Sequence, residues 1–125
     1  LDSEIPSQVD QSVPGMGGGL EGESGNPGYS SEIAGVVNIA GAIKTVDFMS
    51  EDGMPLVSVH GDNDGTVPYG SGMILLSGVP ITEVDGSQTI HEAAESLGVE
   101  SCFTTLEGAG HAAHVSDPDA YYQTL

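Results

Sequence analysis

An acidic side chain and a histidine stand in two glycine-rich segments of this sequence, each directly after a short apolar run. Residues 60–69 contain Asp64, and residues 108–111 read Gly-Ala-Gly-His and end at His111. A carboxylate that accepts a hydrogen bond from one imidazole nitrogen fixes the tautomer of the ring and stabilises its charged form. These residue types therefore predict a carboxylate–histidine pair, in which Asp64 is the acidic residue that orients the ring and His111 is the base.

Three apolar runs are the elements that must position these side chains. Residues 33–41, 55–60 and 102–106 are short and rich in β-branched residues, which predicts strands, and the first run is typical of a buried strand in a parallel sheet. The carboxyl ends of parallel strands meet at one edge of a sheet, where open α/β sheets collect their chemistry. We therefore expect Asp64 and His111 to follow neighbouring strands.

Helical spacing appears between the second and third predicted strands. Apolar residues recur at positions 90, 93, 94 and 97, and this spacing predicts a crossover helix. Asp85 or Ser87 can cap its start and Gly98 can end it. A further helix is predicted to begin at Asp117-Pro118, where an N-cap residue precedes proline.

Strand, crossover helix and strand together predict the α/β class, with parallel strands joined by helices. Three strands and one good helix leave sheet edges and one sheet face bare, so we expect the chain to be part of a larger sheet. Residues 1–31 are rich in Gly, Pro, Ser and Asn and read as a loop-rich segment, whereas residues 32–125 carry the strands and helices.

Charge narrows the classes of partner. Lys44 is the only basic side chain against 19 Asp and Glu, and the formal net charge is −18. Such a chain repels phosphates, which makes nucleic acid an unsuitable partner, and a saline or extracellular setting would screen its self-repulsion.

No apolar run is long enough for a membrane span. Cys102 is the single cysteine, so no intrachain disulfide can form, and we expect it to be buried in a strand.

The two segments resemble motifs of the α/β-hydrolase superfamily. Residues 60–68 show His-Gly, two variable residues, the acid, two more residues and Val-Pro, and residues 108–111 show Gly-x-Gly-His. Residues 19–31 are similar to the corresponding loop of secreted bacterial esterases and lipases of this superfamily. The resemblance implies hydrolysis of a small-molecule carboxylic ester by a Ser-His-Asp triad, with Asp64 and His111 in their matching roles. It implies neither a cofactor nor a metal, and it favours an extracellular or periplasmic location.

The nucleophile of that triad has no match here. It requires Gly-x-Ser-x-Gly, and Ser24, which comes nearest, has Gly22 before it but Asn26 after it. We therefore expect residues 1–125 to be the C-terminal portion of a single α/β-hydrolase domain, which begins after the nucleophile and is inactive alone.

Other interpretations of the same residues stay open. Asp62 and Asp64 can belong to an Asx-rich turn with solvated carboxylates, and His111 and His114 can share a metal ion, although spacing marks no third ligand. A calcium loop fails, because His60 and Ser71 occupy the first and twelfth positions where acids are needed. His91 is expected to be solvated. The competing function is a non-catalytic hydrolase-like protein or an acidic binding module.

Overall fold

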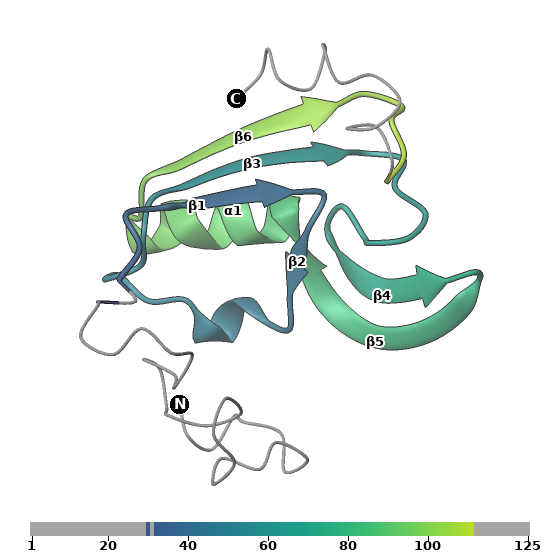
Figure 1. Cartoon of the computed structure of the whole chain (residues 1–125), viewed down its shortest axis with the longest axis horizontal. Helices are drawn as coiled ribbons and strands as arrows, with labels where there is room; N and C mark the ends of the chain where they lie inside the picture. The colour runs from purple at the N-terminus through teal and green to yellow at the C-terminus, as the bar shows by residue number, and fades with distance from the viewer. Residues whose placement is uncertain (1–29, 31, 112–125) are drawn as a thin grey trace, which may run out of the picture. The chain divides into compact units, whose positions relative to one another are not determined.

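The computed structural model of the chain describes residue 30 and residues 32–111 (Figure 1). The chain divides into two units, Leu1–Ile33 and Ala34–Leu125, and every helix and strand named below lies in the second. The helix predicted from Asp117 and the positions of Ser24 and His114 lie outside the described residues, as does nearly all of the predicted loop segment.

A parallel sheet of three strands forms the centre of the second unit. It consists of β1 (Val36–Ile39), β3 (Leu56–Gly61) and β6 (Ser101–Leu106), in the order β1-β3-β6. The arrows of these strands point the same way in Figure 1, and the register pairs Leu56 with both Val36 and Ser101. The strands predicted over 55–60 and 102–106 are therefore confirmed, and β3, which has a neighbour on each side, is buried along nearly its whole length.

The first predicted strand is shorter and more exposed than its sequence indicated. It ends at Ile39 because Ala40 adopts a positive φ of 48°, and the amide of Ala40 donates to the carbonyl of Val59. Val36 and Val37 are exposed rather than buried. Among the described strands β1 lies at the edge of the sheet, where it lacks the second neighbour that buries β3.

The crossover helix is confirmed as α1 (Ser87–Leu97), and its end was correctly predicted. Gly98 adopts a left-handed φ of 74° and donates its amide to the last turn. The predicted start is wrong, because the N-cap is Gly86, which offers no side-chain cap. Asp85 belongs to the preceding strand, and Ser87 lies inside the helix with its hydroxyl in contact with other buried polar groups.

The hydrophobic core lies between α1 and the parallel sheet. Ile90 and Ala94 of the helix are buried together with Leu56 of β3 and Val99 of the turn before β6. Figure 1 shows α1 behind the sheet. The core is thus formed by the helix face whose apolar spacing the sequence displayed.

A second, antiparallel sheet was not predicted. It consists of β2 (Ala42–Ile43), β5 (Val79–Gly86) and β4 (Ser71–Leu76), in the order β2-β5-β4, and the short helix η3 (Val46–Phe48) follows β2. Ser77 and Gly78 join β4 to β5 with φ values of 51° and 79°, which is the backbone of a tight two-residue hairpin. The dipeptide Ser77-Gly78 between two apolar runs was the available sequence signal.

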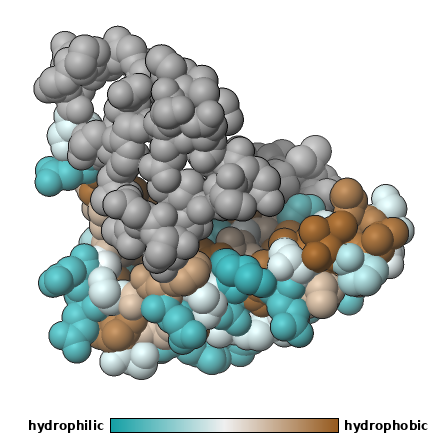
Figure 2. Space-filling model, turned by 90° about the horizontal axis from the view of Figure 1, so that it is seen from below, coloured by the Kyte–Doolittle hydropathy of each residue, from teal (hydrophilic) through white to brown (hydrophobic). Residues whose placement is uncertain are grey.

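The β4–β5 hairpin carries large exposed apolar side chains. Leu76, Val79 and Ile81 are each more than half exposed. Figure 2 shows apolar atoms gathered at the right-hand end of the molecule, where Figure 1 draws this hairpin. No helix among the described residues is long and apolar enough to cross a membrane.

The described residues therefore form a small α/β-type arrangement, with one parallel sheet, one antiparallel sheet and one α-helix. The coarse class agrees with the sequence analysis. Assignment to the hydrolase fold, and to a single domain over residues 1–125, stays a prediction.

Candidate active site

Two loops meet at the carboxyl ends of β3 and β6. Because these strands are parallel neighbours, the segments that follow them leave the sheet at the same edge. Hydrogen bonds tie the loops together: the amide of Asp62 donates to Leu106 O at 3.3 Å, and the amide of Asn63 donates to Ala109 O at 3.1 Å. The Asp62 carboxylate accepts from the amide of Gly108 at 2.6 Å. The exposed carboxylate of Asp62, in the loop after β3, thus holds the loop after β6 in place.

Gly61 allows the loops to approach this closely. A Cβ atom at this position would lie 2.6 Å from the carbonyl carbon of Ala109 and nearer still to its oxygen. Only glycine leaves room for the second loop to cross here without displacing its backbone. The His-Gly pair of the motif therefore has a direct steric function.

The structure brings the two predicted site residues, Asp64 and His111, into contact. Asp64 Oδ2 lies 2.8 Å from His111 Nδ1, the geometry of a short hydrogen bond. The side chain of Asp64 is fully buried, whereas that of His111 is 41% exposed. Because Nδ1 faces a carboxylate, it carries the proton, and Nε2 is left as the basic nitrogen of the neutral ring.

Asp64 is held as a carboxylate by its surroundings. Burial would raise the pKa of Asp64, but the opposing hydrogen bonds from the Thr66 amide, His111 and the Val67 amide lower it below its ordinary value of 3.8. The Thr66 and Val67 amides both donate to Oδ1, at 2.8 and 3.0 Å. The loop after β3 therefore satisfies one carboxylate oxygen with backbone donors and presents the other to His111.

His60 is a third member of the site, and sequence reasoning treated it only as part of the motif. Its side chain is fully buried, and its Nε2 lies 3.1 Å from the same Asp64 Oδ2 that His111 binds. On the other side of the ring, Nδ1 lies 2.7 Å from Ser87 Oγ. A histidine at the end of a mainly apolar run, directly before Gly61, was the sequence signal that could have identified it.

Ser87, His60 and Asp64 lie in the order of a catalytic triad, but Ser87 cannot act as a nucleophile. Both Ser87 and His60 are fully buried, so no substrate carbonyl can reach the hydroxyl. Ser87 Oγ instead accepts from the Asn38 side chain at 3.0 Å and lies 3.2 Å from the carbonyl oxygen of Gly41. The buried hydroxyl of Ser87 therefore contacts the ring of His60 in the interior, on the edge opposite Asp64.

Several alternative interpretations can now be compared with the geometry. The Asx-turn interpretation is confirmed in part: Asp64 Oδ1 accepts from the amide of Thr66, as in an Asx turn, and Asp62 is exposed. The expected solvation is wrong for Asp64, because its side chain is fully buried. Over residues 32–111, no group of three or more His, Cys, Asp or Glu side chains is placed to hold a metal ion, and His114 lies outside that range.

Two expectations about single residues are wrong. Cys102 lies in a strand as expected but is exposed. Successive side chains of a strand alternate between the two faces of the sheet, and the side chain of Cys102 lies on the more exposed face. His91 is largely buried rather than solvated, with Nδ1 2.7 Å from Ser101 Oγ and its side chain 21% exposed.

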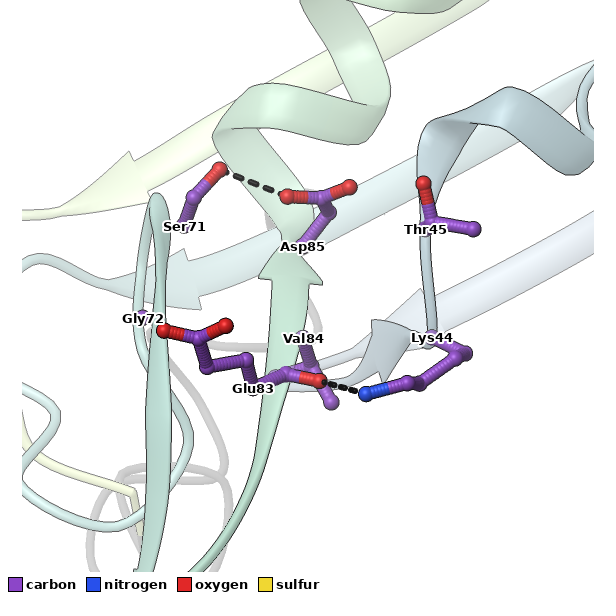
Figure 3. Close-up of a pocket in the computed structure, with 7 residues that line it drawn as sticks. All are labelled: Lys44, Thr45, Ser71, Gly72, Glu83, Val84 and Asp85. Carbon is purple, nitrogen blue, oxygen red and sulfur yellow. Dashed lines mark hydrogen bonds between the residues drawn. The ribbon is translucent and has the colours of Figure 1, made fainter.

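A separate pocket of about 480 Å³ lies over the antiparallel sheet (Figure 3). Its polar groups are largely paired with one another. Lys44 Nζ donates to Glu83 O at 2.8 Å, and Ser71 Oγ donates to Asp85 Oδ1 at 2.6 Å. None of the residues that contact Asp64 lines this pocket. Asp64 and His111 therefore lie outside this pocket, in the loops after β3 and β6.

Comparison with protein-family models, with curated proteins and with solved structures finds no match to this chain. The functional assignment therefore depends on the geometry of Asp64, His111 and His60.

Proposed function

We propose that this chain supplies the acid and the base of a serine hydrolase that acts on small-molecule carboxylic esters. The observation that carries the proposal is the 2.8 Å contact between Asp64 Oδ2 and His111 Nδ1, made by loops that leave two neighbouring parallel strands. The resemblance of residues 60–68 and 108–111 to α/β-hydrolase motifs supplies the reaction class. The proposal includes an extracellular or periplasmic location, as in the secreted esterases that these motifs resemble.

The geometry supports a definite division of roles. Asp64 holds the Nδ1–H tautomer of His111, so that Nε2 takes the proton of an attacking serine and returns it to the leaving alcohol. The acyl group is then carried by the serine as an ester. Water attacks this ester while His111 takes the proton of the water and returns it to the serine, which releases the carboxylic acid. The carboxylate stays ionised during the cycle, because its donors lower the pKa of Asp64. The partly exposed ring of His111 is accessible to the reacting groups.

The proposal requires a nucleophile that this sequence does not contain in a Gly-x-Ser-x-Gly context. The serine and the oxyanion donors would come from residues outside these 125. Within the described part of the chain, the buried hydroxyl of Ser87 does not meet this requirement.

The test is made on the protein expressed from its complete reading frame. We expect it to hydrolyse a p-nitrophenyl ester and to be labelled by a fluorophosphonate probe. Asp64→Asn should lower kcat by about 10⁴-fold, because an amide in place of Oδ2 favours the wrong tautomer of the base. His111→Ala should also lower kcat by orders of magnitude, because it removes the base.

Glu107→Gln is the matched control, since it makes the same change of charge at an exposed position on the loop that carries His111. Its kcat should stay near the wild-type value. Wild-type rates in Asp64→Asn and His111→Ala would refute the proposal.

A non-catalytic binding protein is the second candidate. The absence of Gly-x-Ser-x-Gly from the chain favours it. In that case the complete protein would take up no fluorophosphonate and hydrolyse no ester, while the Asp64 and His111 substitutions would alter only its stability.

A further inference from the structure

The ring of His60 is held on both sides by polar groups in the interior. Its Nε2 lies 3.1 Å from Asp64 Oδ2 and 3.3 Å from the carbonyl oxygen of Val67. Both neighbours are acceptors, so Nε2 must carry a proton and donate. The ring also makes an edge contact with Tyr69 at a centroid separation of 5.8 Å.

A chain of buried groups fixes the opposite edge of the ring. His60 Nδ1 lies 2.7 Å from Ser87 Oγ, at the start of α1. Ser87 Oγ in turn accepts from Asn38 Nδ2 of β1. His60, Ser87 and the neighbouring Ser58 are all fully buried, so their hydrogen bonds are costly to leave unmade.

One carboxylate oxygen therefore receives two imidazole donors. Asp64 Oδ2 accepts from His60 Nε2 and from His111 Nδ1, while Oδ1 accepts from two backbone amides. Rotation of the carboxylate would break all of these bonds together. Without His60, Oδ2 would have a single donor on a partly exposed side chain to hold its direction.

We propose that His60 is a positioning residue, which through its Nε2–H directs Asp64 Oδ2 at His111 and so fixes the tautomer of the base. The inference rests on the proposed function, because a base must exist for the tautomer to matter in catalysis. It is nevertheless open to a direct measurement on the histidine rings that needs no substrate.

Two substitutions of His60 separate donation from packing. In His60→Gln the side-chain amide reaches the place of Nε2 and can still donate to Asp64. In His60→Asn the shorter amide reaches only the place of Nδ1, where it meets Ser87 and leaves Asp64 without this donor. Both remove the ring, so a purely structural role predicts that the two variants behave alike.

The readout is proton–nitrogen NMR of isotope-labelled histidine in the protein expressed from its complete reading frame. In the wild type we expect a proton on Nε2 of His60 and on Nδ1 of His111. His60→Gln should preserve the Nδ1–H signal of His111, and His60→Asn should replace it with a mixture of tautomers. In the ester assay, His60→Asn should lower kcat by about tenfold or more relative to His60→Gln at similar KM.

The outcomes are separable from those of the proposed function. A wild-type His60 with no proton on Nε2 would overturn the inference even if both variants failed to fold. Equal behaviour of the two variants would also overturn it. If the tautomers respond as expected but the protein hydrolyses no ester, the positioning role stands and the proposed function falls.

Discussion

Replacement of Gly61 by alanine tests whether close passage of the two loops creates the site. The new Cβ would lie 2.6 Å from the Ala109 carbonyl carbon, whereas ordinary van der Waals contact begins at 3.4 Å. The segment before His111 must therefore move away by about 0.8 Å or more, because the Cβ would meet the backbone carbonyl group of Ala109, which cannot rotate away as a side chain can.

This displacement is large relative to the hydrogen bond between Asp64 and His111 that it disturbs. The Asp64–His111 distance of 2.8 Å would approach or exceed the limit of a useful hydrogen bond, and the Asn63 amide would lose its 3.1 Å bond to Ala109. Overpacking of this kind costs about 1–3 kcal/mol of stability. A misplacement of about 1 Å in a catalytic group lowers turnover by about 100-fold.

The assay combines kcat on a p-nitrophenyl ester, the free energy of unfolding in urea and the NMR signal of the His111 Nδ1 proton. Gly65→Ala is the matched control, because a Cβ there meets no atom within 4 Å and Gly65 stands in the loop that carries Asp64. Gly61→Ala should lose both activity and the Nδ1 signal while Gly65→Ala keeps them. The reasoning is refuted if Gly61→Ala keeps the Nδ1 signal and wild-type turnover.

Three further predictions concern stability. Because the pKa of Asp64 is lowered in the folded state, its ionised form stabilises the protein at pH values above the ordinary 3.8, and this stabilisation is lost as the pH falls below that value. In urea titrations, the difference in the free energy of unfolding between wild type and Asp64→Asn should therefore shrink over that pH range, and a constant difference would contradict the assignment. With Lys44 as the only basic side chain and a net charge of −18, the melting temperature should rise with NaCl, and no rise at any salt concentration would count against self-repulsion. Ile90→Ala should cost about 2–5 kcal/mol in urea unfolding, because Ile90 is buried between α1 and the sheet, and a loss well below 1 kcal/mol would show that the core is not closed there.

Local patterns predicted the elements that carry the site. The apolar runs ending at His60 and Leu106 became parallel neighbours, and the spacing of Ile90 and Ala94 marked the buried face of α1. These features follow from periodicity, which depends only on residues close in the chain. The β4–β5 hairpin was missed because its turn, Ser77-Gly78, is a weaker hairpin signal than Asn-Gly.

The sequence by itself determined which chemical groups are present and where each leaves its strand, so Asp64 and His111 could be named from type and position. Only the tertiary structure decided that one oxygen of Asp64 contacts two histidines and that His60 contacts Ser87, which in turn accepts from Asn38. All of these contacts except the one between His60 and Asp64 join residues far apart in the chain, and their distances depend on strand register, on helix placement and on the space left by Gly61. No local pattern encodes that combination.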